Sequence, residues 1–274
     1  MISIIIPASN EAAHIGACLA ALLNSDGPEG AQVVVVANGC TDDTADRARG
    51  FAGQARARGW QLLVLELPGI GKPGALNAGD GVARHDMRAY LDADVVVDAP
   101  LMADIAGALS TDQPRYASGR MRLARAQSRA TRAYARIYAR VPFVTQDVPG
   151  AGLFAVNGAG RARWGDFPDI ISDDTFVRLS FAPRERIGVA SGYDWPLVEG
   201  FGALVRVRRR QNAGVAEIAR LYPDLPGNDD TPAVSVWQKL GLALSDPPGF
   251  AVYGGVALIV KLTPQRHAAW ERGR

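Results

Sequence analysis

The sequence contains little cysteine and little histidine, with two Cys and three His among 274 residues. Two cysteines are too few for a disulfide framework, and Cys18 and Cys40 do not have the spacing of metal ligands. We therefore expect reduced thiols and a protein of the cytoplasm.

Long hydrophobic runs are also absent. The apolar part of "PGFAVYGGVALIVKLTP" holds roughly 14 residues, whereas a membrane-spanning helix needs roughly 20, so we expect a buried or interfacial segment. The first residues, "MISIIIPASNE", run directly into a short apolar stretch without a basic leader or a small-residue cleavage site. This pattern predicts no export signal.

Acidic residues are scarce in the second half of the chain relative to basic ones. Residues 1–113 contain 14 Asp or Glu and 7 Lys or Arg, whereas residues 114–274 contain 14 acidic and 23 basic residues. One basic stretch spaces its arginines for a single helical face: Arg125, Arg129, Arg132, Arg136 and Arg140. Such a face can attract phosphates or the anionic lipid of an inner membrane surface. Alternatively, its arginines pair with the acidic half of the chain. Nucleic acid is not expected as a partner, because the acidic half would repel a polyanion.

What the chain does contain is an alternation of strand and helix patterns. The predicted strands are "ISIIIPAS", "AQVVVVANGC", "WQLLVLELP" and "MRAYLDADVVV". Asn10 is the predicted N-cap of the first helix, and Gly59 ends the second, which covers "TDDTADRARGFAGQARARG". The pattern predicts an α/β, Rossmann-like, mostly parallel sheet with helices on both faces. Ligands of such sheets bind beyond the carboxyl ends of the strands.

Two aspartates interrupt the fourth predicted strand. Asp92 and Asp94 lie one residue apart in "YLDADVVVD", and alternate side chains of an extended segment leave from the same face. Two converging carboxylates suit Mg²⁺ or Mn²⁺, which completes its coordination with water and substrate phosphates. The simpler interpretation is a solvated strand end that binds nothing. The preceding "GIGKPGALNAG" is by itself a glycine-rich turn in which Lys72 offers a positive charge.

Taken together and in order, five segments resemble the family 2 glycosyltransferases, which have the GT-A fold. The segments are "IIIPASNEAAHIGACLAALL", "VVVVANGCTDDT", "GKPGALNAG", "YLDADVVVD" and "FPDIISDDTFVRLSF". The resemblance runs from Ile2 to about Gly214 and implies a nucleotide-sugar donor, a divalent metal and inversion at the anomeric carbon. The positions that match the donor-binding parts of the family are Pro7, Ala8, Asn10, Glu11, Asn38, Asp42, Lys72 and Asp92, with Asp92 and Asp94 as metal ligands. Asn38 stands where the family has an aspartate, which weakens the prediction of a uracil base.

The resemblance also assigns the catalytic base. Asp174 matches it, and its neighbour Asp173 is the second candidate, because an inverting transfer needs one carboxylate to take the proton of the acceptor hydroxyl. Alternatively, "SDD" caps a helix, which is compatible with catalysis. The stretch "VRVRRRQNAG" resembles the arginine-rich segment that steadies the departing diphosphate, with Arg208, Arg209 and Arg210 as candidates. Alternatively, its arginines protect an edge strand from aggregation. The tryptophan of the processive Q-x-x-R-W motif is missing, which favours transfer of a single sugar.

The domain organisation follows from these assignments. Residues 1–113 form the predicted nucleotide-sugar-binding half, residues 114–221 the acceptor-binding half, and residues 222–274 a linker and a C-terminal extension. The favoured activity is a metal-dependent inverting glycosyltransferase with an acceptor that is lipid-linked or phosphorylated. The alternatives are a sugar nucleotidyltransferase, which would need a basic loop after the first strand, and a non-catalytic sugar-nucleotide-binding protein.

Overall fold

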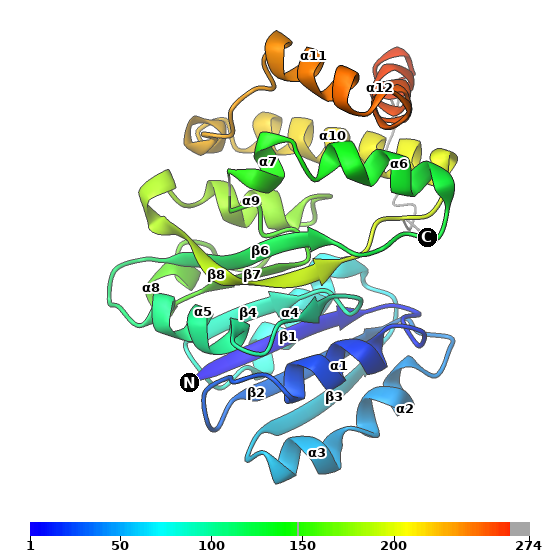
Figure 1. Ribbon diagram of the computed structural model, residues 1–274. Coiled ribbons are helices and arrows are strands. Elements are labelled where there is room, and N and C mark those ends of the chain that lie inside the picture. Colours follow the sequence, from blue (N-terminus) through cyan, green and yellow to red (C-terminus); the bar gives the residue numbers. More distant parts are fainter. Residues whose placement is uncertain (147, 264–274) are drawn as a thin grey trace.

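The structure is a computed structural model that describes residues 1–146 and 148–263 (Figure 1). Eight strands form one sheet in the order β3-β2-β1-β4-β7-β6-β8-β5. The strands are β1 Ile2–Ala8, β2 Gln32–Asn38, β3 Gln61–Leu67, β4 Met87–Leu91, β5 Val96–Val97, β6 Tyr116–Leu123, β7 Leu153–Val156 and β8 Arg186–Trp195. Strands β3, β2, β1 and β4 are parallel, as are β6 and β8, whereas β7 is antiparallel to both of its neighbours and β5 is antiparallel to β8.

Fourteen helical segments accompany the sheet in the described chain. The α-helices are α1 Ile15–Leu23, α2 Thr44–Arg49, α3 Ala52–Ala57, α4 Gly71–Val82, α5 Leu101–Leu109, α6 Arg129–Tyr138, α7 Pro142–Thr145, α8 Gly158–Arg161, α9 Asp173–Leu179, α10 Phe201–Leu221, α11 Val236–Ser245 and α12 Pro247–Leu262. Two short 3₁₀ helices are η1 Pro183–Glu185 and η2 Leu225–Asn228. The predicted α/β fold is confirmed.

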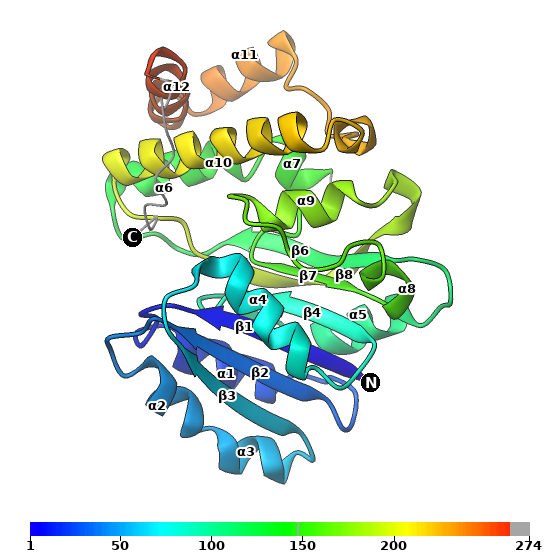
Figure 2. The ribbon, with the colours of Figure 1, turned by 180° about the vertical axis from the view of Figure 1, so that it is seen from behind.

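Helices cover both faces of the sheet, as buried parallel strands require. On one face, α1 and α5 pack on strand residues such as Ile4 and Val33. On the other, α4 and α9 pack on Ile5 and Val34, and Figure 2 shows α4 in front of β1. The apolar side chains alternate between the two clusters because successive strand residues point to opposite faces.

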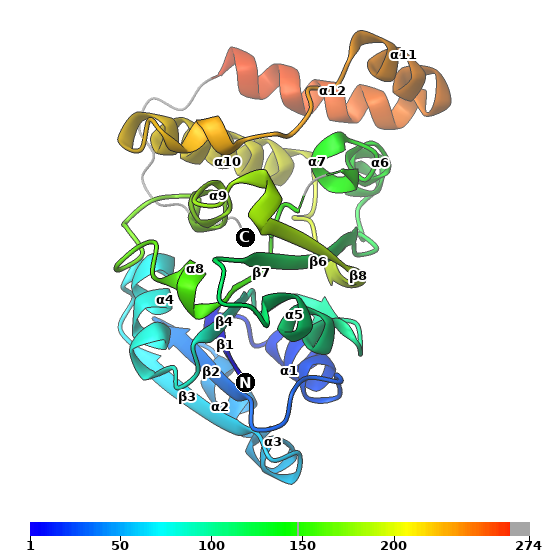
Figure 3. The same cartoon turned by 90° about the vertical axis from the view of Figure 1, so that its left-hand side faces the viewer.

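A third layer lies beyond the sheet. Helices α6, α7, α10, α11 and α12, which we call the helical cap, are stacked above α9 in Figure 3. Tyr134 of α6, Val205 of α10 and Val256 of α12 belong to one buried cluster, which is separate from the two clusters on the sheet. The cap therefore has a core of its own.

Several local predictions were wrong. Asn10 does not cap α1, which begins five residues later with His14 as its N-cap, and Asn10 has a positive φ of 57°. The second predicted helix is divided into α2 and α3. The glycine-rich segment is helical from Gly71 onward, and the close fit of Gly79 against Ile5 of β1 explains one of its glycines.

The arginine-rich segments also differ from prediction. "VRVRRRQNAG" lies within α10 and is not an edge strand, because residues such as Leu204 and Ile218 bury one side of a helix there. Of the five arginines predicted on one helical face, Arg125 precedes α6 and Arg140 follows it. The face therefore holds three of the five.

The C-terminal apolar segment forms α12, with Val256 and Val260 buried. Among residues 1–146 and 148–263, no helix combines the length and hydrophobicity needed to cross a membrane. The predicted extension over residues 222–274 continues past Thr263 into residues 264–274, which lie outside the described residues.

Candidate active site

A cleft with a volume of about 430 Å³ opens at the carboxyl ends of β1 and β4, facing α9 and the helical cap. Twelve of the positions selected from the sequence line it: Pro7, Ala8, Asn10, Glu11, Asn38, Lys72, Asp92, Asp94, Asp173, Asp174, Arg208 and Arg210. They come from β1 and the loop after it, β2, α4, the turn after β4, α9 and α10, so segments far apart in the chain meet at one place. The cleft lies where ligands bind in open α/β sheets.

A lysine bridges two carboxylates at the centre of this cleft. Lys72 Nζ lies 3.0 Å from Asp92 Oδ1 and 3.1 Å from Asp173 Oδ2. Desolvation would lower the pKa of Lys72, but the carboxylates of Asp173 and Asp92 outweigh it and raise that pKa, so the side chain is a cation. The three groups join the metal motif to the start of α9.

The start of α9 places two adjacent carboxylates in different surroundings. The side chain of Asp173 is 7% exposed and is held by Lys72. Asp174 is half-buried, lines the cleft, and accepts a hydrogen bond of 2.7 Å from Thr175 N. Burial, and then the negative charge of Asp173, raise the pKa of Asp174 to about 6. A carboxylate with such a pKa is both ionised at neutral pH and a better base than a free aspartate.

A glycine in the cap allows α9 to start at this point. A Cβ on Gly214 of α10 would collide with Ser172 Oγ and would lie 3.0 Å from Ser172 Cβ. Nearby, Ile171 N donates to Glu217 Oε2 at 2.9 Å. Helix α10 therefore fixes the position of the residues just before Asp173.

Asn38 holds the loop that carries Lys72. Its Nδ2 donates to the carbonyl of Gly71 at 2.8 Å, and its Oδ1 accepts from Ile70 N at 2.9 Å. Both ends of the buried amide are therefore engaged with backbone, although Asn38 borders the cleft. Gly39, which has a positive φ of 61°, lies against Gly69 of this loop, where a Cβ on Gly39 would come within 2.8 Å of Gly69 Cα.

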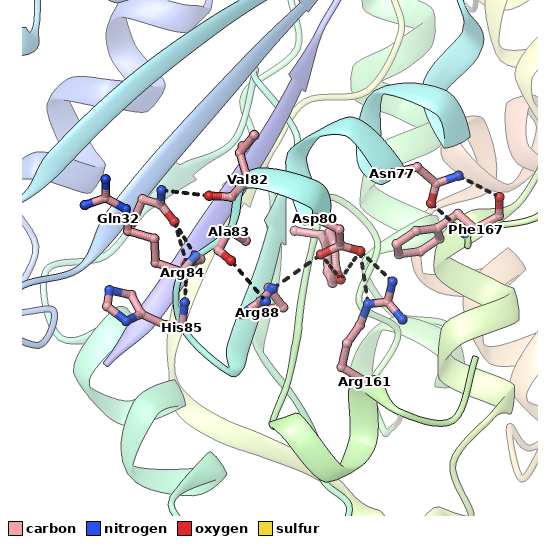
Figure 4. A network of polar contacts seen from close by, with 12 residues as sticks. Gln32, Asn77, Asp80, Val82, Ala83, Arg84, His85, Arg88, Arg161 and Phe167 are labelled. Atoms are coloured by element: carbon pink, nitrogen blue, oxygen red, sulfur yellow. Dashed lines mark hydrogen bonds and ion pairs between the residues drawn. The ribbon is translucent and has the colours of Figure 1, made fainter. Parts of the chain in front are cut away.

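A polar network anchors the rest of α4 on the side away from Lys72. Asp80 accepts hydrogen bonds from Tyr90 Oη at 2.9 Å and Arg161 Nε at 3.0 Å (Figure 4). Asn77 exchanges two hydrogen bonds with the backbone of Phe167, at 2.6 and 3.1 Å. These contacts join α4 to the segment that leads into α9, so the helix of Lys72 and the helix of Asp173 are held together.

The two aspartates of the D-x-D motif lie in a turn and not within a strand. Strand β4 ends at Leu91, and Val95 N donates to Asp92 O at 3.2 Å. The predicted extended geometry was therefore wrong, although both side chains line the same cleft. Asp92 N donates to Gly152 O at 2.8 Å, and Gly152 has a positive φ of 78° at a point where a Cβ would meet Trp195.

Other selected residues have different positions. Asp42 is outside the cleft lining and joins two loops by accepting hydrogen bonds of 3.1 Å from both Ala12 N and Thr44 N. Desolvation would raise the pKa of Asp42, but the hydrogen bonds from Thr44 and Ala12 lower it overall. Asn10 Oδ1 similarly accepts from Thr41 N at 2.7 Å.

The arginines of α10 are divided between two sides of the helix. Arg208 and Arg210 line the cleft, whereas Arg209 is not among its lining residues and donates to Thr263 Oγ1 at 2.6 Å. Arg208 Cζ lies 5.9 Å from the ring centre of Tyr138. No carboxylate of the described chain lies within ion-pair distance of Arg208.

Sequence reasoning missed the wall that the helical cap contributes. From the cap it includes Tyr134 and Tyr138 of α6 and Leu204 of α10, and it is extended by Trp195 of β8 and by Leu197 and Val198 of the loop after β8. The i, i+4 spacing of the two tyrosines in "AYARIYAR" placed them on one helical face, but only the packing of α6 shows that this face borders the cleft.

Several solved glycosyltransferases are similar to this chain over 84% or more of its length. A mannosyltransferase of Pyrobaculum calidifontis, in complex with GDP-Man and Mn²⁺, is 20% identical with a TM-score of 0.60, over 96% of this chain and 76% of that one. Glucosyl-3-phosphoglycerate synthase of Mycobacterium tuberculosis, in complex with Mn²⁺, UDP-glucose and phosphoglyceric acid, is 18% identical with a TM-score of 0.56, over 84% and 81% of the two chains. S. aureus TarS 1–349 with UDP-GlcNAc is 15% identical with a TM-score of 0.54, over 100% and 95%. These likenesses show the fold.

A match of the sequence itself identifies the family. No curated protein matches the chain. Residues 3–156 match the family described as "Glycosyl transferase family 2", and this segment contains β1 to β7 with the D-x-D turn and Lys72. Because the match covers more than half of the chain, the protein belongs to glycosyl transferase family 2 and is a transferase enzyme with the GT-A fold.

Proposed function

We propose that this protein transfers one sugar from a nucleotide-diphosphate donor to an acceptor hydroxyl, with inversion at the anomeric carbon. The observation that carries the proposal is the cluster of Lys72, Asp92, Asp173 and Asp174 in the cleft of a family 2 fold. The cluster combines a cation for phosphate with one carboxylate, that of Asp174, in surroundings suited to a base.

The donor would occupy the side of the cleft formed by β1 and β2. Pro7, Ala8, Asn10 and Glu11 border it there and offer backbone and side-chain polar groups. Asn38 acts indirectly in this proposal, because its amide is engaged with the loop before Lys72. Asp42 likewise acts by joining the loops after β1 and β2.

Mg²⁺ or Mn²⁺ fits the carboxylates at this site. Among the described residues, no three His, Cys, Asp or Glu side chains form a ready metal site. Magnesium typically takes one or two protein carboxylates together with water and phosphate oxygens, and Asp92 and Asp94 provide two hard oxygen ligands at the cleft. Asp92 binds the ammonium of Lys72 through Oδ1, so Oδ2 of the same carboxylate can bind a second cation. When bound, the ion would neutralise charge on the departing diphosphate.

The positive side chains of the cleft would steady the leaving group. Lys72, Arg208 and Arg210 all line the cleft, and charge-assisted hydrogen bonds to phosphate are strong where water is partly excluded. Arg209, which contacts Thr263, has no such role in the proposal.

Asp174 is the proposed base. It would take the proton of the acceptor hydroxyl while the bond between the anomeric carbon and the diphosphate oxygen breaks and the hydroxyl oxygen bonds to that carbon. Asp173 is the weaker candidate because Lys72 holds its buried carboxylate. Its proposed role is to orient Lys72 and to keep Asp174 basic.

The acceptor side of the cleft supports a phosphorylated or lipid-linked acceptor. Tyr134, Tyr138 and Leu204 form an apolar wall there, beside Arg208. A cation next to aromatic rings can bind a phosphate while the wall contacts an apolar or sugar moiety.

A thermal-shift screen tests this function. GDP-Man, UDP-glucose and UDP-GlcNAc would each be added with and without Mn²⁺, and we expect one of them to raise the melting temperature only when the metal is present. Asp94→Asn should abolish that metal-dependent shift, whereas Asp112→Asn, at an exposed position before β6, should preserve it. An unchanged shift in Asp94→Asn would remove the metal role of this residue.

A further inference from the structure

Two helices of the cap present apolar side chains to solvent. The exposed fractions on α11 are 82% for Trp237, 47% for Leu240 and 82% for Leu244, and α12 adds Leu258 at 56% and Leu262 at 70%. Of the twelve large hydrophobic side chains that are exposed in the described chain, seven belong to these two helices. Single exposed apolar residues are ordinary, whereas several on two neighbouring helices indicate an interaction surface.

The orientation of α11 is the reverse of that of an ordinary surface helix. Trp237, Leu240 and Leu244 follow one another at spacings of three and four, so they share one face. The single buried side chain of α11, Leu242, lies on the opposite side. The apolar stripe that normally faces a core here faces away from the protein.

Helix α12 has apolar residues on both sides. Val256 and Val260 are buried in the core of the cap, while Leu258 and Leu262 are exposed on the far side. Figure 3 shows α11 and α12 as the outermost layer of the molecule on this side. We call their exposed apolar residues the outer face: Val236, Trp237, Leu240, Leu244, Leu258, Ile259 and Leu262.

The two helices that carry the outer face have a net positive charge. Between Ser235 and Thr263 the only acidic residue is Asp246, whose side chain is 15% exposed and bound to Arg136, whereas Lys239 and Lys261 are exposed. Arg140, which follows α6, donates to Ser245 Oγ at 2.8 Å, and Arg136 of α6 is bound to Asp246, so both arginines reach the junction of α11 and α12.

Two further arginines of α6 add to this charge. Arg129 and Arg132 are exposed, and no carboxylate of the described chain pairs with either of them. Helix α6 packs against α12, so its arginine row borders the outer face.

We propose that the outer face docks the protein on the surface of an anionic lipid bilayer. Leucines and a tryptophan that project from helices lying flat, with basic residues around them, are the features of an interfacial helix pair. A second copy of the chain fits less well, because a two-fold contact would bring the same positive charges together. The proposal does not depend on the proposed reaction.

Vesicle co-sedimentation tests the proposal without any donor or acceptor. The protein should sediment with phosphatidylcholine–phosphatidylglycerol vesicles far more than with phosphatidylcholine vesicles, and salt should reduce the bound fraction. Leu240→Ser combined with Leu244→Ser should weaken binding by about tenfold or more, because two apolar side chains no longer enter the interface. Val82→Ser, which changes another exposed apolar residue at the end of α4, should bind normally.

Two independent measurements accompany the sedimentation. Anionic vesicles should shift the tryptophan emission to shorter wavelength, and Trp237→Phe should remove most of that shift. Arg129→Gln combined with Lys239→Gln should weaken binding to anionic vesicles without altering the melting temperature, since both side chains are exposed. This second variant tests the surface even if the serine variant folds poorly.

Three results would overturn the proposal. They are absence of binding to either vesicle, equal binding to neutral and anionic vesicles, and a concentration-dependent dimer that the serine variant abolishes. The last result would assign the outer face to a second copy of the chain.

Discussion

Replacing Asp174, the proposed base, should make the protein more stable and at the same time inactivate it. Asp174 is half-buried beside the negative charge of Asp173, and its pKa is raised from 3.8 to about 6. In the folded state the carboxyl group therefore holds its proton more tightly than in the unfolded chain. Ionised Asp174 lowers the free energy of unfolding at neutral pH, and Asp174→Asn removes that penalty while keeping an oxygen that can accept from Thr175 N.

The size of the effect follows from the pKa shift. A shift of about two units corresponds to about 3 kcal/mol, at 1.36 kcal/mol for each unit. The sign is set by proton binding: between pH 3.8 and about 6 the native state binds more protons than the unfolded state, so stability falls as the pH rises through this window. Allowing for small losses in side-chain packing, we expect Asp174→Asn to be more stable by about 1–3 kcal/mol at pH 8.

Urea denaturation followed by circular dichroism measures this difference. The gain should be largest at pH 8, about half as large at pH 5 and about a fifth as large at pH 4, and it should vanish below about pH 3, where Asp174 is protonated in both states. In the same variant, turnover should fall by about a hundredfold or more while donor binding is retained. Asp169→Asn is a matched control, since Asp169 is exposed in the segment that leads to α9 and should show little change at any pH.

Two outcomes would refute this reasoning. A loss of stability in Asp174→Asn at pH 8, or a change in stability that does not vary with pH, would mean that ionised Asp174 does not lower the free energy of unfolding. If Asp173→Asn were inactive and Asp174→Asn retained turnover, the base would be Asp173.

Lys72→Met should lower the free energy of unfolding by about 1–3 kcal/mol in urea denaturation at pH 7, less than for a fully buried pair because Lys72 is 35% exposed. An unchanged stability would show that its two carboxylate partners need no cation. Gly214→Ala should lower the free energy of unfolding by about 1–3 kcal/mol because its Cβ meets Ser172, whereas a Cβ at Gly202 of the same helix would lie 3.8 Å from Arg206 Nη1, so Gly202→Ala should be neutral or slightly stabilising. A pH profile of kcat/KM should decline on the acid side of about pH 6, where Asp174 becomes protonated; a profile flat to pH 4 would exclude Asp174 as the base.

Much of the fold was predictable because the strands are short apolar runs. β1 and β2 are buried along almost their whole length, and the alternation with helices already indicated an α/β sheet. The family motifs also identified the segments that meet in the cleft, because each follows the carboxyl end of a strand or begins a helix. Such signals are local and survive in the sequence alone.

Local patterns failed where a neighbouring segment decided the outcome. The segment "YLDADVVVD" matched a single strand, but β4 ends at Leu91, Asp92 N donates to Gly152 O, and Val96 pairs instead with β8. The alternating arginines of "VRVRRRQNAG" matched a strand, yet the helix that buries Leu204 and Ile218 prevails.

The sequence by itself determined the α/β class, the family and the chemical groups available for catalysis. Only the tertiary structure decided what each group does: Asn38 bonds to the loop before Lys72, Asp42 joins two loops away from the cleft, and Arg209 points away from its neighbours. It also turned the apolar stripe of α11 outward, which the spacing of Leu240 and Leu244 cannot reveal. Periodicity shows that side chains share a face, whereas the partner of that face depends on segments distant in the chain.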